Sequence, residues 1–397
     1  MRVLYFHQHF STPNGATGIR SYQMARKLVG RGHSVTMVCG VYGAGQTGLS
    51  GPYRGGRREG YVDGIKVIEI ALSYNNALGF LGRTIAFMRF ALRSIWISLR
   101  EPFDLVFATS TPLTAALPGM AARWLRGKPF VFEVRDLWPE LPRAMGVITN
   151  PLVIWLMSVL EWTAYHSAHR LIALSPGMVD GIVRRGVEAS RITMIPNGCD
   201  LELFNPKYNA EAPERLKTDK LVVVYSGTHG IANGLEAVLD TASVLLRRRR
   251  RDIVIMLIGD GKLKPALQSR AVNESLSNVC FKDLMPKTEL ACLLASADVG
   301  LQVLSNVPAF YFGTSPNKFF DYLASGLPVL CCYPGWVSDM IEKHQCGVAV
   351  KPEDPEAFAD KLVYLADHRC ELEEMGFRAR QLAEREFNRD DLSDRFV

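Results

Sequence analysis

Two short stretches of the chain bring together residue types that can do chemistry. The first, EVRDLWPE at residues 133–140, holds three carboxylates, an arginine and a tryptophan at the carboxyl end of an apolar run. Helix capping does not need three acids in so short a stretch, and open α/β sheets hold their ligands at the carboxyl ends of strands. We therefore expect one or two of Glu133, Asp136 and Glu140 to act in a site.

The second stretch, GTSPNKFFDYLASGLPVLCC at residues 313–332, has the pattern of a short helix followed by a buried strand. Ser315 before Pro316 predicts an N-cap and a first helical position, and Gly326 with Pro328 predicts the matching end. We expect a helix over residues 316–325 and a strand over residues 329–332.

The start of that helix is a candidate phosphate site. Its unpaired amides near Asn317 and Lys318, together with the Lys318 ammonium, could bind an anion. Asp321, one turn further in, could accept hydrogen bonds from sugar or ribose hydroxyls. An i,i+3 surface ion pair between Lys318 and Asp321 explains the spacing equally well.

A glycine loop near the N-terminus is a third candidate. The loop STPNGATG follows an apolar strand at residues 2–7 and precedes a predicted helix at residues 19–32, so Gly15 and Gly18 lie at a strand's carboxyl end. Arg20, on the first turn of the helix, could meet an anion there. The alternative is a merely tight turn, because GxGxxG spacing is absent.

These stretches need a scaffold, and strands alternate with helices on both sides of one break. The polar, proline-bearing segment 206–219 predicts a linker between domains at 1–205 and 220–375. Two alternating series predict two doubly wound α/β domains facing a cleft. Within the first, the glycine-rich segment 41–64 predicts a mobile loop, and residues 151–169 predict an amphipathic helix.

Length, cysteines and charge narrow the class of protein. A chain of 397 residues can bury two cores, and its eight scattered cysteines suggest a reduced protein without disulfides or a zinc site. The chain enters a strand at once, without a signal-peptide pattern, and no apolar run is suited to crossing a bilayer. Residues 1–100 carry 13 Lys and Arg against three acids, which favours an anionic partner.

The apolar, arginine-bearing helix expected at residues 77–100 leaves two interpretations open. Core packing with arginine rims and binding in a membrane interface fit its composition equally well. The arginine run at residues 247–251 is expected to be a solvated helix end. No aromatic residues interleave it, so we expect no nucleic-acid partner.

Taken together, the motifs resemble the retaining GT-B glycosyltransferases of family 4. The resemblance covers nearly the whole chain and is strongest in the bacterial branch that extends lipid-linked precursors of O-antigen and capsule. It rests on the order and spacing of EVRDLWPE, LIALSPGM, IPNGCDLELF, VVVYSGTHG, IGDGKLKPAL, ADVGLQVL and SPNKFFDYLASGLPVL. The EVRDLWPE and SPNKFFDY blocks look like those of N-acetylfucosamine transferases that act on undecaprenyl-diphosphate sugars.

The resemblance implies roles for the candidate residues. The C-terminal half would bind a nucleotide-sugar, and the helix after Gly376, residues 376–397, would pack back onto the first domain. The acceptor would meet Gly15, Gly18 and Arg20, and the catalytic loop would comprise Glu133, Arg135 and Asp136. Donor-binding residues would be Gly227, Thr228, His229, Gly259, Gly261, Lys262, Ser315, Asn317, Lys318 and Asp321.

Three departures from the family pattern stand out. The family's paired glutamates, separated by seven residues, fall on Gly313 and Asp321 here. The phosphate-binding arginine and lysine of many members are replaced by His229 and Asn233. The histidine that many relatives carry in the catalytic loop appears as Arg135.

We expect a metal-independent glycosyltransferase without a cofactor. Its donor would be a UDP-N-acetylated sugar, its acceptor a lipid-diphosphate saccharide, and its place the cytoplasmic membrane face, held by an anionic lipid surface. A nucleotide-sugar epimerase of the same shape and a catalytically silent binding subunit are the alternatives.

Overall fold

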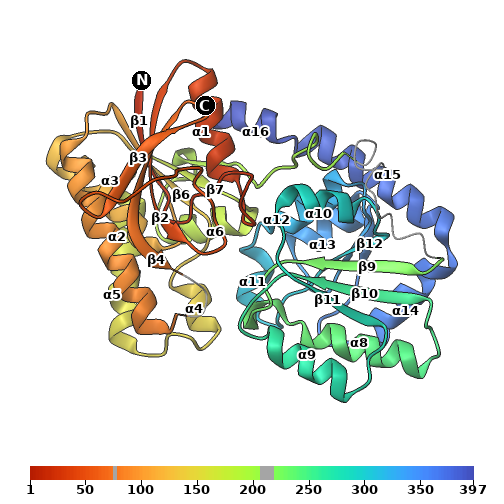
Figure 1. Ribbon diagram of the computed structural model, residues 1–397. Helices are drawn as coiled ribbons and strands as arrows, with labels where there is room; N and C mark the ends of the chain where they lie inside the picture. Colours follow the sequence, from red (N-terminus) through yellow and green to blue (C-terminus); the bar gives the residue numbers. More distant parts are fainter. Residues whose placement is uncertain (75–77, 206–218) are drawn as a thin grey trace. The chain divides into compact units, whose positions relative to one another are not determined.

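The computed structural model describes residues 1–74, 78–205 and 219–397, which form two compact units (Figure 1). The first unit comprises Met1–Pro196, Phe312–Ser315 and Asp390–Val397, and the second comprises the described parts of Asn197–Tyr311 and Pro316–Arg389. Each unit is a Rossmann-like α/β domain with its own sheet and apolar core. The predicted fold class of two doubly wound domains is confirmed, and nearly all of the expected linker at 206–219 lies outside the described residues.

The first unit is built on an eight-stranded sheet with the order β3-β4-β2-β1-β5-β6-β7-β8. All neighbouring strands are parallel except β3, which pairs antiparallel with β4. Strand order reverses on either side of β1, which makes the carboxyl end of β1 a switch point where such sheets hold ligands. The strands are β1 (Arg2–Phe6), β2 (Ser34–Tyr42), β3 (Arg57–Val62), β4 (Ile65–Tyr74), β5 (Leu105–Thr109), β6 (Phe130–Val134), β7 (Arg170–Ala173) and β8 (Ile192–Met194).

Helices cover both faces of this sheet. Figure 1 shows α2, α3 and α5 along one side, and α3 contacts both of the others. The helices are α1 (Arg20–Gly30), α2 (Phe80–Arg100), α3 (Ala116–Arg126), α4 (Glu140–Ala144), α5 (Pro151–Ser167) and α6 (Pro176–Arg184), with α16 (Arg389–Phe396) at the C-terminus. Short 3-10 helices span Leu113–Ala115 and Ala189–Arg191.

Two expectations for the first unit were wrong. The segment 41–64 is not a single loop, because it contains β3, which forms an antiparallel hairpin with β4 around positive-φ Asp63 and Gly64. Helix α5 is not amphipathic, because apolar side chains lie on its exposed face as well as its buried one. No helix among the described residues is both long and apolar enough to cross a bilayer.

The second unit has a six-stranded parallel sheet with the order β11-β10-β9-β12-β13-β14. Its switch point lies at β9, between β10 and β12. The strands are β9 (Leu221–Ser226), β10 (Ile253–Ile258), β11 (Val279–Lys282), β12 (Val299–Gln302), β13 (Val329–Cys331) and β14 (Gly347–Ala349). The helices are α8 (Glu236–Arg247), α9 (Lys264–Asn273), α10 (Lys287–Leu294), α11 (Pro308–Phe312), α12 (Asn317–Ala324), α13 (Trp336–Lys343), α14 (Pro355–Asp367) and α15 (Arg369–Glu386), with a 3-10 turn at Ile231–Asn233.

Helix α12 forms where the sequence predicted a helix, but one position later. Its N-cap position is Pro316, and no side chain caps it. The proposed Ser315 cap was therefore wrong. Proline in the extended conformation can occupy the N-cap because it needs no amide hydrogen there.

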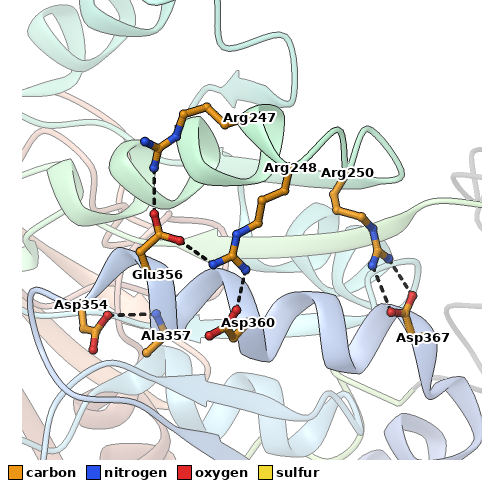
Figure 2. Close-up of polar contacts among 8 residues, drawn as sticks. All are labelled: Arg247, Arg248, Arg250, Asp354, Glu356, Ala357, Asp360 and Asp367. Carbon is orange, nitrogen blue, oxygen red and sulfur yellow. Dashed lines mark hydrogen bonds and ion pairs between the residues drawn. The ribbon is translucent and has the colours of Figure 1, made fainter.

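The arginine run that closes α8 is exposed except at partly buried Arg250, as expected for a solvated helix end, and it also forms ion pairs. Figure 2 shows Arg247, Arg248 and Arg250 paired with acids of α14. Arg247 contacts Glu356 at 2.9 Å, and Arg250 contacts Asp367 at 2.8 Å. These arginines therefore tie two helices together.

Candidate active site

Two glycine-bearing loops lie against each other at the carboxyl ends of β9 and β10. An added Cβ at Gly259 would lie 1.9 Å from the Gly227 carbonyl oxygen, and one at Gly261 would lie 2.5 Å from that of His229. Hydrogen bonds from the Gly227 amide to Ile258 and from the His229 amide to Asp260, both 2.9 Å, lace the loops together. Side chains beyond hydrogen cannot fit at Gly259 or Gly261, so backbone forms the floor of this region.

Lys318, in the first turn of α12, reaches this floor. Its Nζ lies 3.9 Å from the centroid of the Tyr225 ring, and an added Cβ at Gly227 would lie 3.0 Å from Nζ. Among the described residues, Lys318 has neither a carboxylate partner nor a hydrogen-bond acceptor. Burial lowers the pKa of Lys318 to about 7. The Lys318–Asp321 surface pair is excluded, because Lys318 packs on Tyr225 and Asp321 pairs with another lysine.

His229 is a second polar side chain without a partner. It is fully buried, and neither ring nitrogen has a hydrogen-bond partner among the described residues. Burial, followed by the charge of Lys264, lowers the pKa of His229 to about 4. A neutral imidazole with both nitrogens unused is costly unless a ligand supplies hydrogen bonds.

Lys264, which sequence analysis did not select, supports the GDGK turn at residues 259–262 through hydrogen bonds. Its buried Nζ donates to the carbonyl oxygens of Gly259 at 2.9 Å and Lys282 at 3.2 Å, and pairs with Asp283 at 2.6 Å. The selected Lys262 is exposed instead. The sequence alone could not predict that Lys264 is buried and Lys262 exposed, because the two lysines lie only two positions apart.

The remaining donor candidates lie in different settings. Asp321 is buried in an ion pair with Lys287, the first residue of α10, which sequence analysis also missed. Thr228 is exposed beside Gly227, and its carbonyl accepts from the Tyr225 hydroxyl at 2.9 Å. Asn317 is partly exposed and precedes Lys318, whereas Ser315 belongs to the segment grouped with the first unit.

In the first unit, the predicted anion contact and one predicted catalytic acid bind each other. Arg20 Nε donates to Glu133 Oε1 at 2.9 Å, and its other nitrogens donate to the carbonyls of Ile195 and Pro196. Thr109 donates to Glu133 Oε2 at 2.7 Å. Both side chains are buried, so this pair joins α1 to β6 and leaves neither group available to a ligand.

The charge of Glu133 is held by its surroundings. Burial alone would raise the pKa of its carboxyl, but the Arg20 and Arg135 charges, with the hydrogen bonds from Thr109 and Arg20, lower it below its ordinary value. Glu133 is therefore an ionised structural residue. Of the other two acids of this stretch, Asp136 is partly exposed, whereas Glu140 is exposed at the start of α4 and lies 3.8 Å from Arg184.

Asp136 and Arg135 lie just beyond the end of β6. Asp136 is partly exposed, and its Oδ2 accepts from Thr111 Oγ1 at 2.6 Å. The Arg135 guanidinium lies 3.3 Å from His7 Nε2, and its amide donates to Ser110 at 2.8 Å. Burial, followed by the Arg135 charge, lowers the pKa of His7 well below its ordinary value, so His7 accepts from Arg135 as a neutral ring.

His7 was missed, although a signal for it exists. It is the first residue after β1, at the switch point of the first sheet, and the sequence HQH there interrupts an apolar strand abruptly. Its Nδ1 has no hydrogen-bond partner among the described residues. Polar residues that directly follow the first strand are thus as informative as the glycines that come later.

The glycine loop is shaped by packing. An added Cβ at Gly15 would lie 2.2 Å from Ser11 Oγ and 2.8 Å from the Gln46 amide. Gly18 is partly exposed two residues before α1. A hollow of about 410 Å³ opens beside this loop, with Asn14, Gln46 and the ion-paired Arg58 and Glu69 in its wall.

Comparison with known proteins matches each half of the chain to a protein family model. Residues 15–198 match the model described as a glycosyl transferase 4-like domain, and residues 220–368 match that of glycosyl transferases group 1. Across 428 aligned residues, the chain is 24% identical to the putative colanic acid biosynthesis glycosyl transferase WcaI of Escherichia coli. That alignment covers 100% of the chain and 99% of WcaI.

Solved structures share the fold at low sequence identity. A sucrose-phosphate synthase from Thermosynechococcus elongatus superposes with a TM-score of 0.76 at 16% identity, covering 100% of this chain and 97% of that one. Anabaena HepE, solved in complex with UDP and glucose, superposes with a TM-score of 0.70 at 16% identity, covering 100% and 98%. At such identities the superpositions support the architecture alone.

Proposed function

The chain carries a glycosyl transferase 4-like domain and a glycosyl transferases group 1 domain and is a glycosyltransferase of the GT-B fold, and from this premise we propose its donor, acceptor and mechanism. We propose that it moves a sugar, with retention, from a UDP-N-acetylated sugar to a lipid-diphosphate saccharide in surface polysaccharide synthesis. N-Acetylfucosamine is the sugar that the motif resemblance favours. Both family descriptions name transferases, which favours transfer over an epimerase or a silent subunit.

The observation that carries the donor proposal is Lys318. A partly buried ammonium without an anionic partner among the described residues, beside a floor of packed glycine backbone, is suited to a diphosphate. His229 supplies two further unused nitrogens at the same floor. HepE is a relative in fold that binds UDP, which supports UDP as the nucleotide.

The reaction breaks the bond between the sugar's anomeric carbon and the leaving phosphate oxygen, and the bonding electrons stay on the phosphate. Lys318 would stabilise the developing negative charge by preorganised electrostatics, and we propose that no metal ion is required. Retention places the acceptor hydroxyl on the leaving-group side. Its oxygen bonds to the anomeric carbon while its proton passes to the departing phosphate oxygen.

On the acceptor side, we assign Asp136 the role of orienting the acceptor hydroxyl. Its Oδ2 is held by Thr111, it is partly exposed, and it lies near the switch point of the first sheet. The hollow beside Gly15 offers polar groups for the acceptor's sugars. The name of the relative WcaI refers to the biosynthesis of colanic acid, which supports a polysaccharide product. With such a product we propose a lipid-linked acceptor at the cytoplasmic membrane face.

One assay tests this proposal. The purified protein is incubated with a panel of radiolabelled UDP-sugars, with and without a diphosphate-lipid saccharide. We expect label to enter the lipid with at least one donor. An altered sugar formed without acceptor would instead indicate an epimerase, and binding without turnover of any donor would indicate a silent subunit.

A further inference from the structure

Helix α5 exposes a stripe of large apolar side chains that no described element covers. The side chains are exposed by 43% to 62%, although they are of the types most often buried. At about 100° per residue they fall within a sector of roughly 120°. They are Leu152, Trp155, Leu156, Val159 and Trp162.

The other side of α5 anchors it to the first unit. Ala164 and Tyr165 are buried, and Glu161 receives a hydrogen bond of 2.7 Å from Arg185 Nε. The helix starts firmly, since Asn150 accepts from the Leu152 amide at 2.9 Å. The exposed stripe is therefore held in place by a rigid helix.

Helix α2 carries a matching stripe. Its outer side chains are Leu81, Ile85, Met88, Leu92, Trp96 and Leu99, exposed by 36% to 70%. At about 100° per residue they lie within a sector of roughly 80°, and the exposed Arg89, Arg93 and Arg100 follow along one edge. The opposite side packs in the core through Phe90 and Ile97.

These positions revise the two interpretations of α2 that the sequence left open. Core packing holds for one side of the helix, whereas the other side faces outward and the membrane interpretation stays a prediction. Phe87 is not part of the outer stripe, because its ring stacks on Tyr74 at 5.4 Å. Arg83 lies off the arginine row and donates to the Leu78 carbonyl at 2.8 Å.

Charge on this side of the domain identifies the kind of partner. Helices α2, α3 and α5 together contain six arginines and a single acid, Glu161, which is buried and paired with Arg185. Helix α3, which lies beside the other two (Figure 1), adds exposed Trp124 and Leu125. A second copy of the chain would bring the same arginines and no free acid, whereas an anionic lipid surface complements them.

We propose that the α2–α5 face, defined by the two stripes and the arginine row, docks on an anionic lipid bilayer. The α5 stripe enters the headgroup boundary through Trp155 and Trp162, which are suited to that depth because their rings are amphipathic. Arg89, Arg93 and Arg100 contact lipid phosphates. The proposal rests on the proposed function, since a lipid-linked acceptor gives the enzyme a reason to bind there.

The test separates the apolar and the charged contributions. Full-length wild type and the double variants W155Q/W162Q and R89E/R100E are sedimented with vesicles of phosphatidylcholine, with and without phosphatidylglycerol. We expect wild type to bind the anionic vesicles at least tenfold more tightly. Each double variant should bind the anionic vesicles at least tenfold more weakly than wild type, and 1 M salt should weaken the binding of wild type to them.

Two controls match these changes. R83E reverses one arginine of α2 that lies off the row, and F377S removes an apolar side chain from the second unit that is 65% exposed. Both should bind like wild type. Circular dichroism melts should show that the variants at exposed positions keep the wild-type unfolding temperature within a few degrees, and the melt of R83E shows whether the loss of its hydrogen bond to Leu78 affects folding.

Three outcomes would overturn the proposal. They are unchanged vesicle binding by W155Q/W162Q, equal binding of wild type to neutral and anionic vesicles, and a dimer that W155Q/W162Q dissociates in sedimentation velocity. A soluble short-chain acceptor keeps the proposed function separate. Transfer of sugar to this soluble acceptor should be equal in wild type and variants. If wild type binds vesicles but transfers no sugar to the soluble acceptor, the result counts against the transfer reaction alone.

Discussion

Lys318 shows how one residue can report a missing ligand. Taking an ammonium partly out of water costs free energy, and among the described residues the Tyr225 ring is the contact that offsets this cost. The fold keeps the arrangement although Lys318→Met would fit an apolar setting. We interpret the lysine as a group selected to meet the negative charge that develops on the leaving diphosphate.

Lys318→Ala is therefore expected to lower transfer by about 10- to 1,000-fold, the effect of losing one electrostatic stabiliser of a transition state. Because the side chain makes no polar contact among the described residues, the unfolding temperature should hardly fall. Initial rates at saturating donor give the measurement. Wild-type turnover in this variant would show that Lys318 has no phosphate role.

The pKa of Lys318 predicts in which direction the affinity for UDP changes with pH. With a pKa of about 7 in the free protein, Lys318 is charged below that pH with or without ligand. A bound diphosphate raises the pKa of Lys318, so above pH 7 the binding of UDP must take up a proton. The affinity for UDP then falls by up to about tenfold per pH unit. Calorimetric titration of UDP from pH 7 to 9 should show this fall in wild type and not in Lys318→Met.

Asp136 and Glu133 are expected to differ in kind. Asp136→Asn should abolish transfer and leave UDP binding intact, because the carboxylate is placed to orient the acceptor. Glu133→Gln should lower stability instead, since breaking a buried ion pair costs about 3–5 kcal/mol. Transfer rates and urea unfolding of both variants separate the roles, and a fully active Asp136→Asn would remove that residue from the mechanism.

At the scale of elements, hydrophobic periodicity predicted the positions of the strands well. It did not predict which polar side chains are buried or which of them pair with each other. Residues 221–227 had to be a strand, since five consecutive apolar or aromatic positions are followed by serine and glycine. Glu133 and Arg20 are 113 positions apart, so no local pattern could show that they pair. Lys264 and Lys287 were missed for the same reason, because only tertiary packing distinguishes them from surface lysines.

The junction of α8 and α14 is an element-scale feature of this kind (Figure 2). Arg250 donates to Asp367 at 2.8 and 3.0 Å and to Asp252 at 2.9 Å, which raises the pKa of Arg250 further above its ordinary value. Its acid partners are about half exposed, so solvent screens the network. Arg250→Gln should cost about 1 kcal/mol or less of unfolding free energy at low salt.

Urea unfolding at low salt and in 1 M salt measures this prediction, and the high salt should shrink the difference. Arg251→Gln is the matched control, because Arg251 forms no ion pair with any described residue. Equal stability of wild type and Arg250→Gln at low salt would show that the network holds nothing together.

At the scale of the whole molecule, the chain ends in the unit where it began. Asp390–Val397 belongs to the first unit, in which Leu392 is buried and the Phe396 ring packs edge-on against Phe107 at 4.9 Å. Lys27 pairs with Asp394 at 3.0 Å. The C-terminal residues thus complete the core of the first unit, which otherwise ends at Pro196 apart from Phe312–Ser315.

Leu392→Ala is accordingly expected to destabilise the first unit by about 2–5 kcal/mol, the cost of a cavity at a buried leucine. Each unit has its own core, so the loss should be local. Hydrogen exchange should rise in peptides from α1 and β5 and stay near wild type in those from β9 and β10. Asp391→Ala, at the exposed neighbouring position, should leave all four unchanged. Increased exchange confined to β9 and β10 would mean that Leu392 supports the second core instead.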